Sequence, residues 1–271
     1  MASSESETGS QAGLQGAAPR PVNLPHIESL DVAARYHPAR CGGDFFDAVA
    51  PDSRVLFMLT DIAGRRPETQ AIAVEIQNVF RTRAQDLFED LDANESEGIG
   101  LLARDINRSL IEAARGVRFA PAFLGCYNLT LNILTYQYAG HFLALFHDGE
   151  KTRVLEPCGI PLGLFTHSTY EPAILAFDRH AKLLLVTKGI TEDRQGGTVF
   201  DDERISLLLE NSTTDSASIC EAVLRVADDS ENHPKSRALL RSRKQKYRDD
   251  LTAVALVRRG DTPDSAHPPE R

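Results

Sequence analysis

The sequence predicts an α+β fold in which helices cover layers of mostly antiparallel sheet. Helical periodicity is confined to two regions of the chain, residues 67–110 and 202–228. Between them, short apolar segments follow one another directly and are separated by turn residues such as His147-Asp148-Gly149. Clustered helices and consecutive strands favour layered α+β packing. The chain has 271 residues, 42% of them hydrophobic, and can therefore bury a substantial core.

The first clear strand is SRVLFMLTD, residues 53–61, which ends in the polar turn DIAG. Pro67 suits the first turn of a helix that follows directly. Apolar residues recur at helical spacing in this segment, at Ile72, Ile76, Val79, Phe80 and Leu87. A second helix is predicted from a shared apolar face made of Ile99, Leu102, Ile106 and Leu110.

Six short strands are predicted in the middle of the chain, at residues 122–131, 135–140, 142–146, 152–155, 172–177 and 182–187. Two helices are expected near 202–210 and 216–228, before a final strand at 251–257. These elements form one domain, residues 25–258. Residues 1–24 and 259–271 contain few bulky apolar groups, so we expect them to be disordered tails.

The formal net charge of −9 argues against nucleic acid as a partner, because an acidic chain repels a phosphate backbone. No apolar run approaches the ~18 residues of a membrane span, and no signal pattern begins the chain. We therefore expect no membrane association and a cytoplasmic location. Residues 233–248 are strongly basic, which favours a solvated loop or helix face; the alternative is a docking patch for an acidic partner or phosphate.

Aspartates stand at strand ends or beside glycine in three places: Asp44 and Asp47 in GGDFFDA, Asp61 in LTDIAG, and Asp249-Asp250 in RDDLTAVAL. Carboxylates and carbonyls that converge at a sheet rim are hard oxygen ligands for Mg²⁺ or Mn²⁺. The alternative is that each aspartate caps its own turn, and taken singly this is the commoner role of such a residue. Their spacing in the sequence does not show whether these aspartates lie close together in the fold.

Six ordered motifs give the chain a family resemblance: ARYHPARCGGDFFDAV, VLFMLTDIAG, YQYAGHFLALF, CGIPLGLF, KLLLVTKGITED and RDDLTAVALV. Together they resemble the SpoIIE-like branch of the PPM family of metal-dependent protein serine/threonine phosphatases, over residues ~30–258. The resemblance implies a four-layer α/β/β/α sandwich with two mostly antiparallel sheets and a two-metal centre at one edge. It also implies hydrolysis of phosphoserine or phosphothreonine on a regulatory protein, such as an anti-sigma-factor antagonist, by metal-activated water.

The family's metal positions correspond to individual residues of this chain. The resemblance assigns Asp44 to the GGD aspartate, Asp61 to the bridging aspartate and Ile62 to the residue whose backbone carbonyl contacts a metal. Asp249 corresponds to the late aspartate, and Asp250 is its neighbour near the rim. The implied cofactor is Mg²⁺ or Mn²⁺.

Two motifs depart from the family pattern. Ala63-Gly64-Arg65-Arg66 stands where serine-glycine-histidine-glycine is usual, and Lys188-Gly189 stands where an aspartate ligand is followed by glycine. An ammonium a few ångströms from a metal ion costs several kcal/mol, so we expect one ion rather than two. Lys188 is expected to pair with Asp61 and Asp249 in place of a metal; the alternative is a turn lysine that points to solvent.

The sequence leaves three functions open. In the first, a phosphatase with an altered centre holds one metal at Asp61 and the Ile62 carbonyl, while Lys188 stabilises the phosphate and Arg65 and its neighbour Arg66 add donors. In the second, hydrolysis is lost and a pseudophosphatase serves as a binding module for a phosphoprotein or regulator. The third, an interaction protein with no link to phosphate, agrees least with the retained acidic motifs.

Overall fold

A computed structural model of the chain describes residues 18–23, 27–38, 42–140, 142–191, 202–212, 215–231 and 249–259. Within these residues, ten strands form two five-stranded sheets in which every strand pair is antiparallel. The first, called the β1 sheet, has the order β1 (Leu30–His37), β10 (Leu251–Arg258), β9 (Lys182–Val186), β6 (Leu143–His147) and β7 (Thr152–Val154). The second, called the β2 sheet, has the order β2 (Asp44–Val49), β3 (Arg54–Asp61), β4 (Ala122–Asn128), β5 (Ile133–Ala139) and β8 (Ala173–Ala176).

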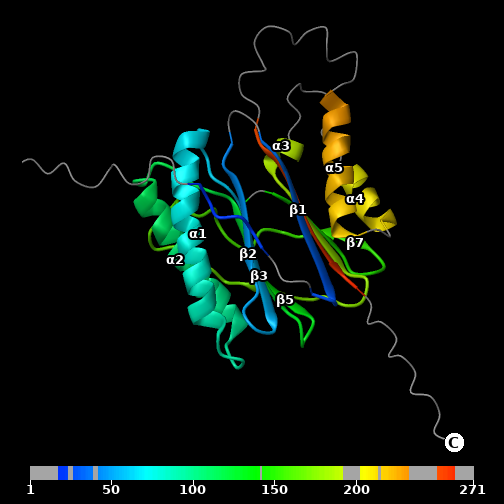
Figure 1. Cartoon of the computed structure of the whole chain (residues 1–271), viewed down its shortest axis with the longest axis horizontal. Coiled ribbons are helices and arrows are strands. Elements are labelled where there is room, and N and C mark those ends of the chain that lie inside the picture. Colours follow the sequence, from blue (N-terminus) through cyan, green and yellow to red (C-terminus); the bar gives the residue numbers. More distant parts are fainter. Residues whose placement is uncertain are drawn as a thin grey trace, which may run out of the picture.

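The helices cover the two outer faces of this sandwich (Figure 1). On the β2 sheet lie α1 (Arg66–Phe88) and α2 (Glu95–Ala113). On the β1 sheet lie α4 (Asp202–Asn211) and α5 (Ser216–Glu231), and the single turn α3 (Lys188–Thr191) follows β9 directly. The predicted four-layer α/β/β/α arrangement is therefore confirmed.

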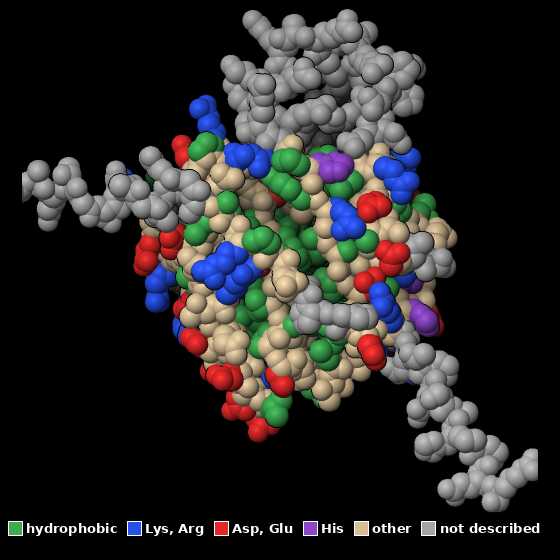
Figure 2. Space-filling view, in the orientation of Figure 1, with side chains coloured by type: hydrophobic (Ala, Val, Ile, Leu, Met, Phe, Trp, Pro, Cys, Tyr) green, Lys and Arg blue, Asp and Glu red, His purple; other side chains and the backbone are tan. Residues whose placement is uncertain are grey.

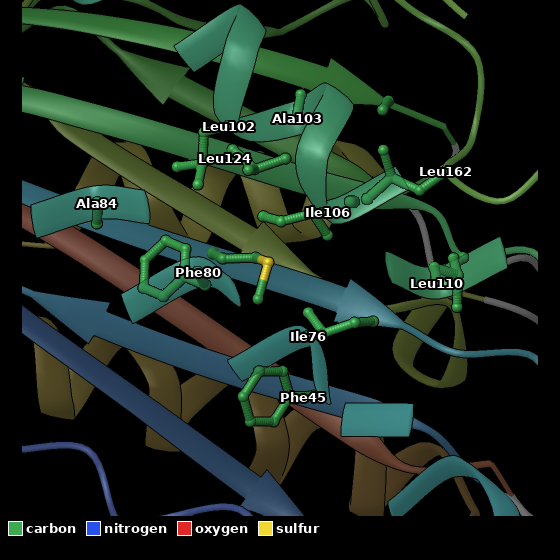
Figure 3. Close-up of a cluster of buried hydrophobic side chains, with 14 of the residues drawn as sticks. Phe45, Ile76, Phe80, Ala84, Leu102, Ala103, Ile106, Leu110, Leu124 and Leu162 are labelled. Carbon is green, nitrogen blue, oxygen red and sulfur yellow. The ribbon is translucent and has the colours of Figure 1, made fainter. Parts of the chain in front are cut away.

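Three hydrophobic cores hold the four layers together. One lies between the two sheets, one between the β2 sheet and α1 and α2, and one between the β1 sheet and α4 and α5. Successive residues of β3 alternate between two of them: Met58 packs against the helices, while Phe57 and Leu59 face the other sheet. Figure 3 shows the helix side of this packing, where Ile76 and Phe80 of α1 meet Ile106 of α2. Because both faces of β3 are buried, its sequence is a continuous apolar run.

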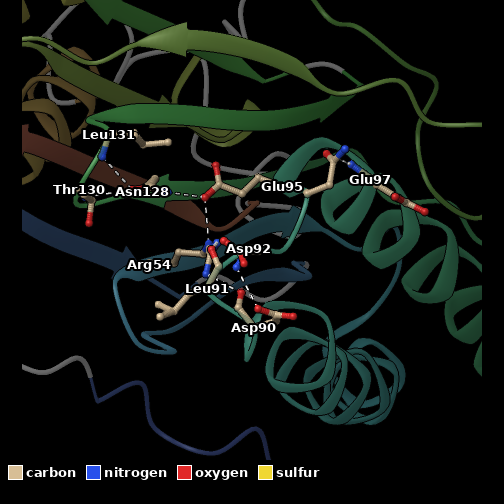
Figure 4. A network of polar contacts seen from close by, with 10 residues as sticks. Arg54, Asp90, Leu91, Asp92, Glu95, Glu97, Asn128, Thr130 and Leu131 are labelled. Carbon is tan, nitrogen blue, oxygen red and sulfur yellow. Dashed lines mark hydrogen bonds and ion pairs between the residues drawn. The ribbon is translucent and has the colours of Figure 1, made fainter.

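A buried arginine fixes the turn between α1 and α2 to the β2 sheet (Figure 4). The Arg54 side chain is almost fully buried and donates to the Glu95 carboxylate across 2.9 Å. It also donates to the carbonyl oxygens of Asp90 and Leu91, and Asn128 donates to the same Glu95 oxygen across 2.6 Å. The two helices therefore have a fixed position over the sheet at the end of β3 that is remote from Asp61.

The elements predicted from residue 53 onward are confirmed, but pattern alone did not identify β1 and β2 as strands. Both are edge strands that mix buried with half-buried or exposed residues, so neither carries a continuous apolar run. The basic segment 233–248 lies outside the described residues, as do residues 1–17 and 24 of the predicted N-terminal tail and 260–271 of the C-terminal one. Residues 18–23 contact α1, where the Arg20 backbone exchanges hydrogen bonds with the Gln77 side chain. None of the described helices is long and apolar enough to cross a membrane.

Candidate active site

Two of the predicted carboxylates meet at one end of the sandwich, here called the rim. Asp44 begins β2 and Asp61 ends β3, and the antiparallel register places these two residues directly opposite each other. Directly opposed residues of neighbouring strands have Cβ atoms ~4.5–5.5 Å apart. The hairpin between the two strands therefore brings together two aspartates that are 17 positions apart in the sequence, 61 minus 44.

Two buried threonines of the other sheet hold the Asp44 carboxylate. The hydroxyl groups of Thr187 and Thr252 donate to Asp44 Oδ2 across 2.7 and 2.6 Å. Burial raises the pKa of Asp44 well above its usual value, the nearby Asp61 carboxylate adds to the rise, and the two hydroxyls act in the opposite direction. A bound cation would act in the opposite direction to burial, because it would stabilise the ionised form of Asp44.

The Ile62 backbone lies against Gly43, the residue before Asp44. The Ile62 amide donates to the Gly43 carbonyl oxygen across 2.9 Å, and the Ile62 side chain is fully buried. A Cβ atom on Gly43 would come within 2.0 Å of the Ile62 carbonyl oxygen, so only glycine leaves this carbonyl in its position. A main-chain oxygen is therefore held beside the two carboxylates.

Asp250 lies at the same rim, but its oxygens are engaged by other side chains. Arg66 donates to Asp250 Oδ1 across 2.7 Å, and Tyr36 donates its hydroxyl to Oδ2 across 3.0 Å. Arg66 also donates to the Tyr36 oxygen across 2.8 Å, and burial raises the pKa of Tyr36 to about 12, which keeps the phenol protonated. Asp250 is buried, whereas its neighbour Asp249 is exposed.

Lys188 and Arg65 are both exposed residues at the ends of rim elements. Lys188 is the first residue of α3, and Arg65 is the residue before α1, where it provides no side-chain cap for the helix. A Cβ atom on Gly189 would lie 2.0 Å from the Asp250 carbonyl oxygen, so α3 is in close contact with the start of β10. Arg66 supplies the cation that pairs with Asp250, and the pairing of Lys188 with Asp61 and Asp249 stays a prediction.

Asp47 lies within β2 and forms an ion pair, so it does not cap a turn. Its carboxylate is fully buried on β2 and accepts two hydrogen bonds from Arg81 of α1, at 2.8 and 2.9 Å. The site residues that sequence reasoning missed are Thr187, Thr252 and Tyr36. The two threonines could have been noticed as hydroxyl residues that end or begin apolar strands beside the KG and DD motifs.

The rim opens into a groove between the two edge strands. This groove has a volume of about 690 Å³, and β1 and β2 form much of its wall, with Asp44 and Thr252 among its lining residues. Figure 2 shows a hollow with apolar side chains on this face, between α1 and α5. An extended segment of another chain could therefore approach the two carboxylates along the edges of both sheets.

A protein-family comparison agrees with this architecture. Residues 51–259, more than half of the chain, match the family described as stage II sporulation protein E (SpoIIE). The chain belongs to the SpoIIE family. The matched range contains Asp61, Lys188 and Asp250, whereas Asp44 and its GGD motif precede it.

Solved structures that share this fold match most of the chain. The RsbU and RsbW domains of Rv1364c from Mycobacterium tuberculosis are 22% identical, with a TM-score of 0.66 over 89% of this chain; the match spans 65% of that longer chain. The SiaA PP2C domain of Pseudomonas aeruginosa is 15% identical, with a TM-score of 0.64 over 85% of this chain and 86% of its own. RsbX in complex with magnesium is 17% identical, with a TM-score of 0.59 over 88% of this chain and 100% of its own.

The SpoIIE family consists of metal-dependent phosphatases, and the rim offers oxygen donors that suit a hard cation. Asp44, Asp61 and the Ile62 carbonyl are oxygen donors of the kind Mg²⁺ takes, since this ion commonly uses one or two carboxylates and completes its shell with waters and phosphate. Asp250 is already bonded to Arg66 and Tyr36. No group of three or more carboxylate, histidine or cysteine side chains among the described residues is arranged to hold a metal by itself.

Proposed function

We propose that this SpoIIE-family protein hydrolyses phosphoserine or phosphothreonine on a regulatory protein at a one-cation centre in the cytoplasm. The observation that carries the proposal is the contrast between the carboxylates of the rim. Asp44 and Asp61 face each other, and burial raises the pKa of Asp44, while Asp250 is bonded to an arginine and a tyrosine of the same chain. We infer that Asp44, Asp61 and the Ile62 carbonyl hold one cation, and that Arg66 supplies positive charge beside them at Asp250.

In this proposal Asp44, Asp61 and the Ile62 carbonyl hold Mg²⁺ or Mn²⁺. The bound ion would supply Lewis-acid polarisation of the phosphoryl group and an activated water. Thr187 and Thr252 keep Asp44 in one orientation through their hydroxyl groups. The arginine fork of Arg66 stays at the rim because Asp250 and Tyr36 hold it there, which suits it to contact phosphoryl oxygens.

Lys188 replaces a ligand aspartate and thereby favours phosphate over a second metal ion. Two like charges a few ångströms apart in a partly dry site cost several kcal/mol, which lowers affinity for a second cation by orders of magnitude. The same ammonium attracts the anionic substrate and stabilises charge on the phosphoryl group, with Arg65 as a further donor at the start of α1.

A second candidate function is phosphoprotein binding without turnover. The Arg66–Asp250 ion pair favours it, because an internal guanidinium stands where a second cation would assist hydrolysis. In this case the protein would hold a phosphorylated regulator of the anti-sigma-antagonist kind, and its rim would recognise the phosphate with Arg66 and Lys188.

The deciding experiment compares wild type with Lys188→Asp and Asp61→Asn, using p-nitrophenyl phosphate and a phosphoserine peptide as substrates in a manganese titration. We expect wild type to hydrolyse both substrates, and Asp61→Asn to lose at least about tenfold in kcat/KM. Calorimetric titration with manganese should show one site in wild type. Lys188→Asp should bind manganese more tightly, because a repulsive charge is replaced by a ligand.

The outcomes separate the two candidates. Wild type that binds the phosphoserine peptide but does not turn over, with or without manganese, supports the binding function. Hydrolysis that is unchanged in Asp61→Asn contradicts the one-cation centre. Wild type that neither binds nor hydrolyses the peptide contradicts both candidates.

A further inference from the structure

We propose that an apolar surface beside the rim docks the protein substrate, next to the phosphorylated residue. This inference rests on the proposed function and names the substrate class more narrowly: a phosphoprotein with apolar and acidic residues close to its phosphoserine. Five large hydrophobic side chains are between 41 and 79% exposed on two loops, which we call the docking surface: Val117, Phe119, Ile160, Leu164 and Phe165. Soluble proteins rarely expose several large apolar side chains together without a binding role.

The two loops of the docking surface are joined to each other. Ala120 and Leu162 exchange both of their backbone hydrogen bonds, at 2.8 and 2.9 Å. A Cβ atom on Gly163 would lie 3.1 Å from the Phe119 Cα atom, and this glycine has a φ of +87°. Phe119 and Leu164 therefore stand on adjoining stretches of backbone, which brings the two loops of the docking surface side by side.

The docking surface is also joined directly to the candidate site. The Asp61 amide donates to the Pro121 carbonyl oxygen, and the Ala63 amide donates to the Phe119 carbonyl oxygen, both across 3.1 Å. Phe119 therefore contacts the turn two residues beyond the candidate ligand Asp61. A substrate with its phosphoserine at Asp44 and Asp61 would place residues a few positions away over Phe119, because an extended chain covers ~3.3 Å per residue.

Helix α2 holds this surface in a fixed position. The Asn107 side chain is buried and donates to the Phe165 carbonyl oxygen across 3.0 Å. The same side chain accepts from the Gly163 amide across 2.7 Å. Because the buried Asn107 side chain already orders this loop, the loop loses little conformational entropy when a partner binds.

The charge around the docking surface selects an acidic partner. Arg115 is exposed, Arg118 stands between Val117 and Phe119, and Arg65 is exposed at the start of α1. Arg118 donates to the Ala63 carbonyl oxygen across 2.8 Å and pairs with Glu68, which keeps its guanidinium beside the DIAG turn. These arginines belong to a chain with a formal charge of −9, so the positive charge is local and complements a phosphorylated, acidic segment.

The test measures binding of fluorescein-labelled phosphoserine peptides of about 15 residues in the presence of manganese. One peptide carries acidic residues and two leucines after the phosphoserine, and a second has alanines in place of the leucines. We expect Phe119→Asp and Phe165→Asp each to weaken binding of the leucine peptide about tenfold or more, since burial of one phenylalanine contributes at least that much. Binding of the alanine peptide should change by less than about threefold.

Leu131→Asp is the matched control, because Leu131 is 62% exposed and lies in the turn between β4 and β5, at the end of β4 remote from Asp61. This control should leave both affinities unchanged. Equal effects of Phe119→Asp and Leu131→Asp, or a wild type that binds both peptides equally, would overturn the docking surface. Binding to phosphatidylserine vesicles that Phe119→Asp abolishes, with peptide binding unchanged, would assign the surface to a membrane and also overturn the proposal.

Hydrolysis of p-nitrophenyl phosphate separates this inference from the proposed function. This small substrate carries no residues beside its phosphate for the docking surface to bind, so Phe119→Asp should leave its kcat/KM unchanged. A wild type that fails to hydrolyse it, yet binds the leucine peptide through Phe119, rejects the catalytic proposal and supports the docking surface.

Discussion

Arg66 donates to Asp250 across 2.7 Å and so joins the first residue of α1 to the residue that precedes β10. The pair crosses the rim from a helix on the β2 sheet to a strand of the β1 sheet. Sequence reasoning predicts a cation among these acids at Lys188, and the structure shows one at Arg66, which is bonded to Asp250. Arg66 belongs to the RR motif, which departs from the family pattern that the sequence resembles.

Replacement of Arg66 by methionine should destabilise the protein by about 1–3 kcal/mol, because the buried Asp250 carboxylate loses its charged partner. Millimolar manganese should restore part of this stability in the variant, since the freed carboxylate gains a cation. Urea unfolding with and without manganese measures both effects.

Arg83→Met is the control for that prediction. Arg83 also belongs to α1 and donates to Asp105, but both side chains are more exposed than Asp250, so the loss should stay below about 1 kcal/mol. Equal losses in the two variants would contradict a special role for the Arg66–Asp250 pair.

Asp44→Asn should stabilise the metal-free protein by about 1–2 kcal/mol, because it removes a desolvated charge that faces Asp61. Manganese should raise the melting temperature of wild type and leave that of this variant unchanged. Asp47→Asn is a matched control on the same strand. It breaks the ion pair with Arg81, so it should lose about 2–4 kcal/mol and keep the manganese effect. If Asp44→Asn is less stable than wild type, groups of the protein already offset the cost of burying the Asp44 charge.

Gly43→Ala should abolish stabilisation by manganese, because the new methyl group would come within 2.0 Å of the Ile62 carbonyl oxygen and displace it. Gly100→Ala in α2 is a suitable comparison, as its methyl group would stay 3.1 Å from the nearest backbone atom. Helix propensity favours alanine there, so the manganese effect should be preserved. Thermal melts in a manganese titration compare the two, and an unchanged response in Gly43→Ala would exclude the Ile62 carbonyl as a ligand.

His147 should make the protein less stable in mild acid. Burial lowers the pKa of this histidine, and the nearby Lys182 ammonium adds to the effect. In the unfolded chain the imidazole titrates near pH 6.5, so the native state binds fewer protons below that pH. Stability is therefore complete above about pH 6.5 and falls as the pH drops toward the lower folded pKa, by up to about 1.4 kcal/mol per pH unit.

Urea unfolding at about pH 7.5, 6.5 and 5.5 measures this slope, and His147→Phe should flatten it. His167→Gln, at an exposed position, should leave the slope as in wild type. A slope that is identical in wild type and His147→Phe would assign the acid sensitivity to other groups.

Much of the fold could be predicted because most of its strands are buried on both faces. The runs around Leu56 and Leu184 are apolar throughout, since consecutive residues enter different cores. The edge strands β1 and β2 gave no such signal, because among the described residues each pairs with a strand on one side only and mixes buried with half-buried residues. They could be placed only through the GGD motif.

The sequence predicted the acidic residues of the candidate site better than the residues that form hydrogen bonds with them. Asp44 and Asp61 follow from motif and strand order, and the hairpin register does bring them together. Thr187, Thr252 and Tyr36 could not be derived, because a hydroxyl group carries no periodicity and its partner depends on how the two sheets stack. The distinction between the buried Asp250 and the exposed Asp249 depends on the same stacking.

The hydroxyl groups of Thr187 and Thr252 have a consequence beyond the orientation of one carboxylate. Thr252 belongs to β10 of the β1 sheet and Thr187 directly follows β9 of that sheet, whereas the carboxylate that they bind belongs to the β2 sheet. These hydrogen bonds at the site thus also connect the two sheets of the sandwich. Any ligand that competes with the threonines for Asp44 must alter how the sheets are held together at that end, so occupancy and sheet alignment are thermodynamically linked.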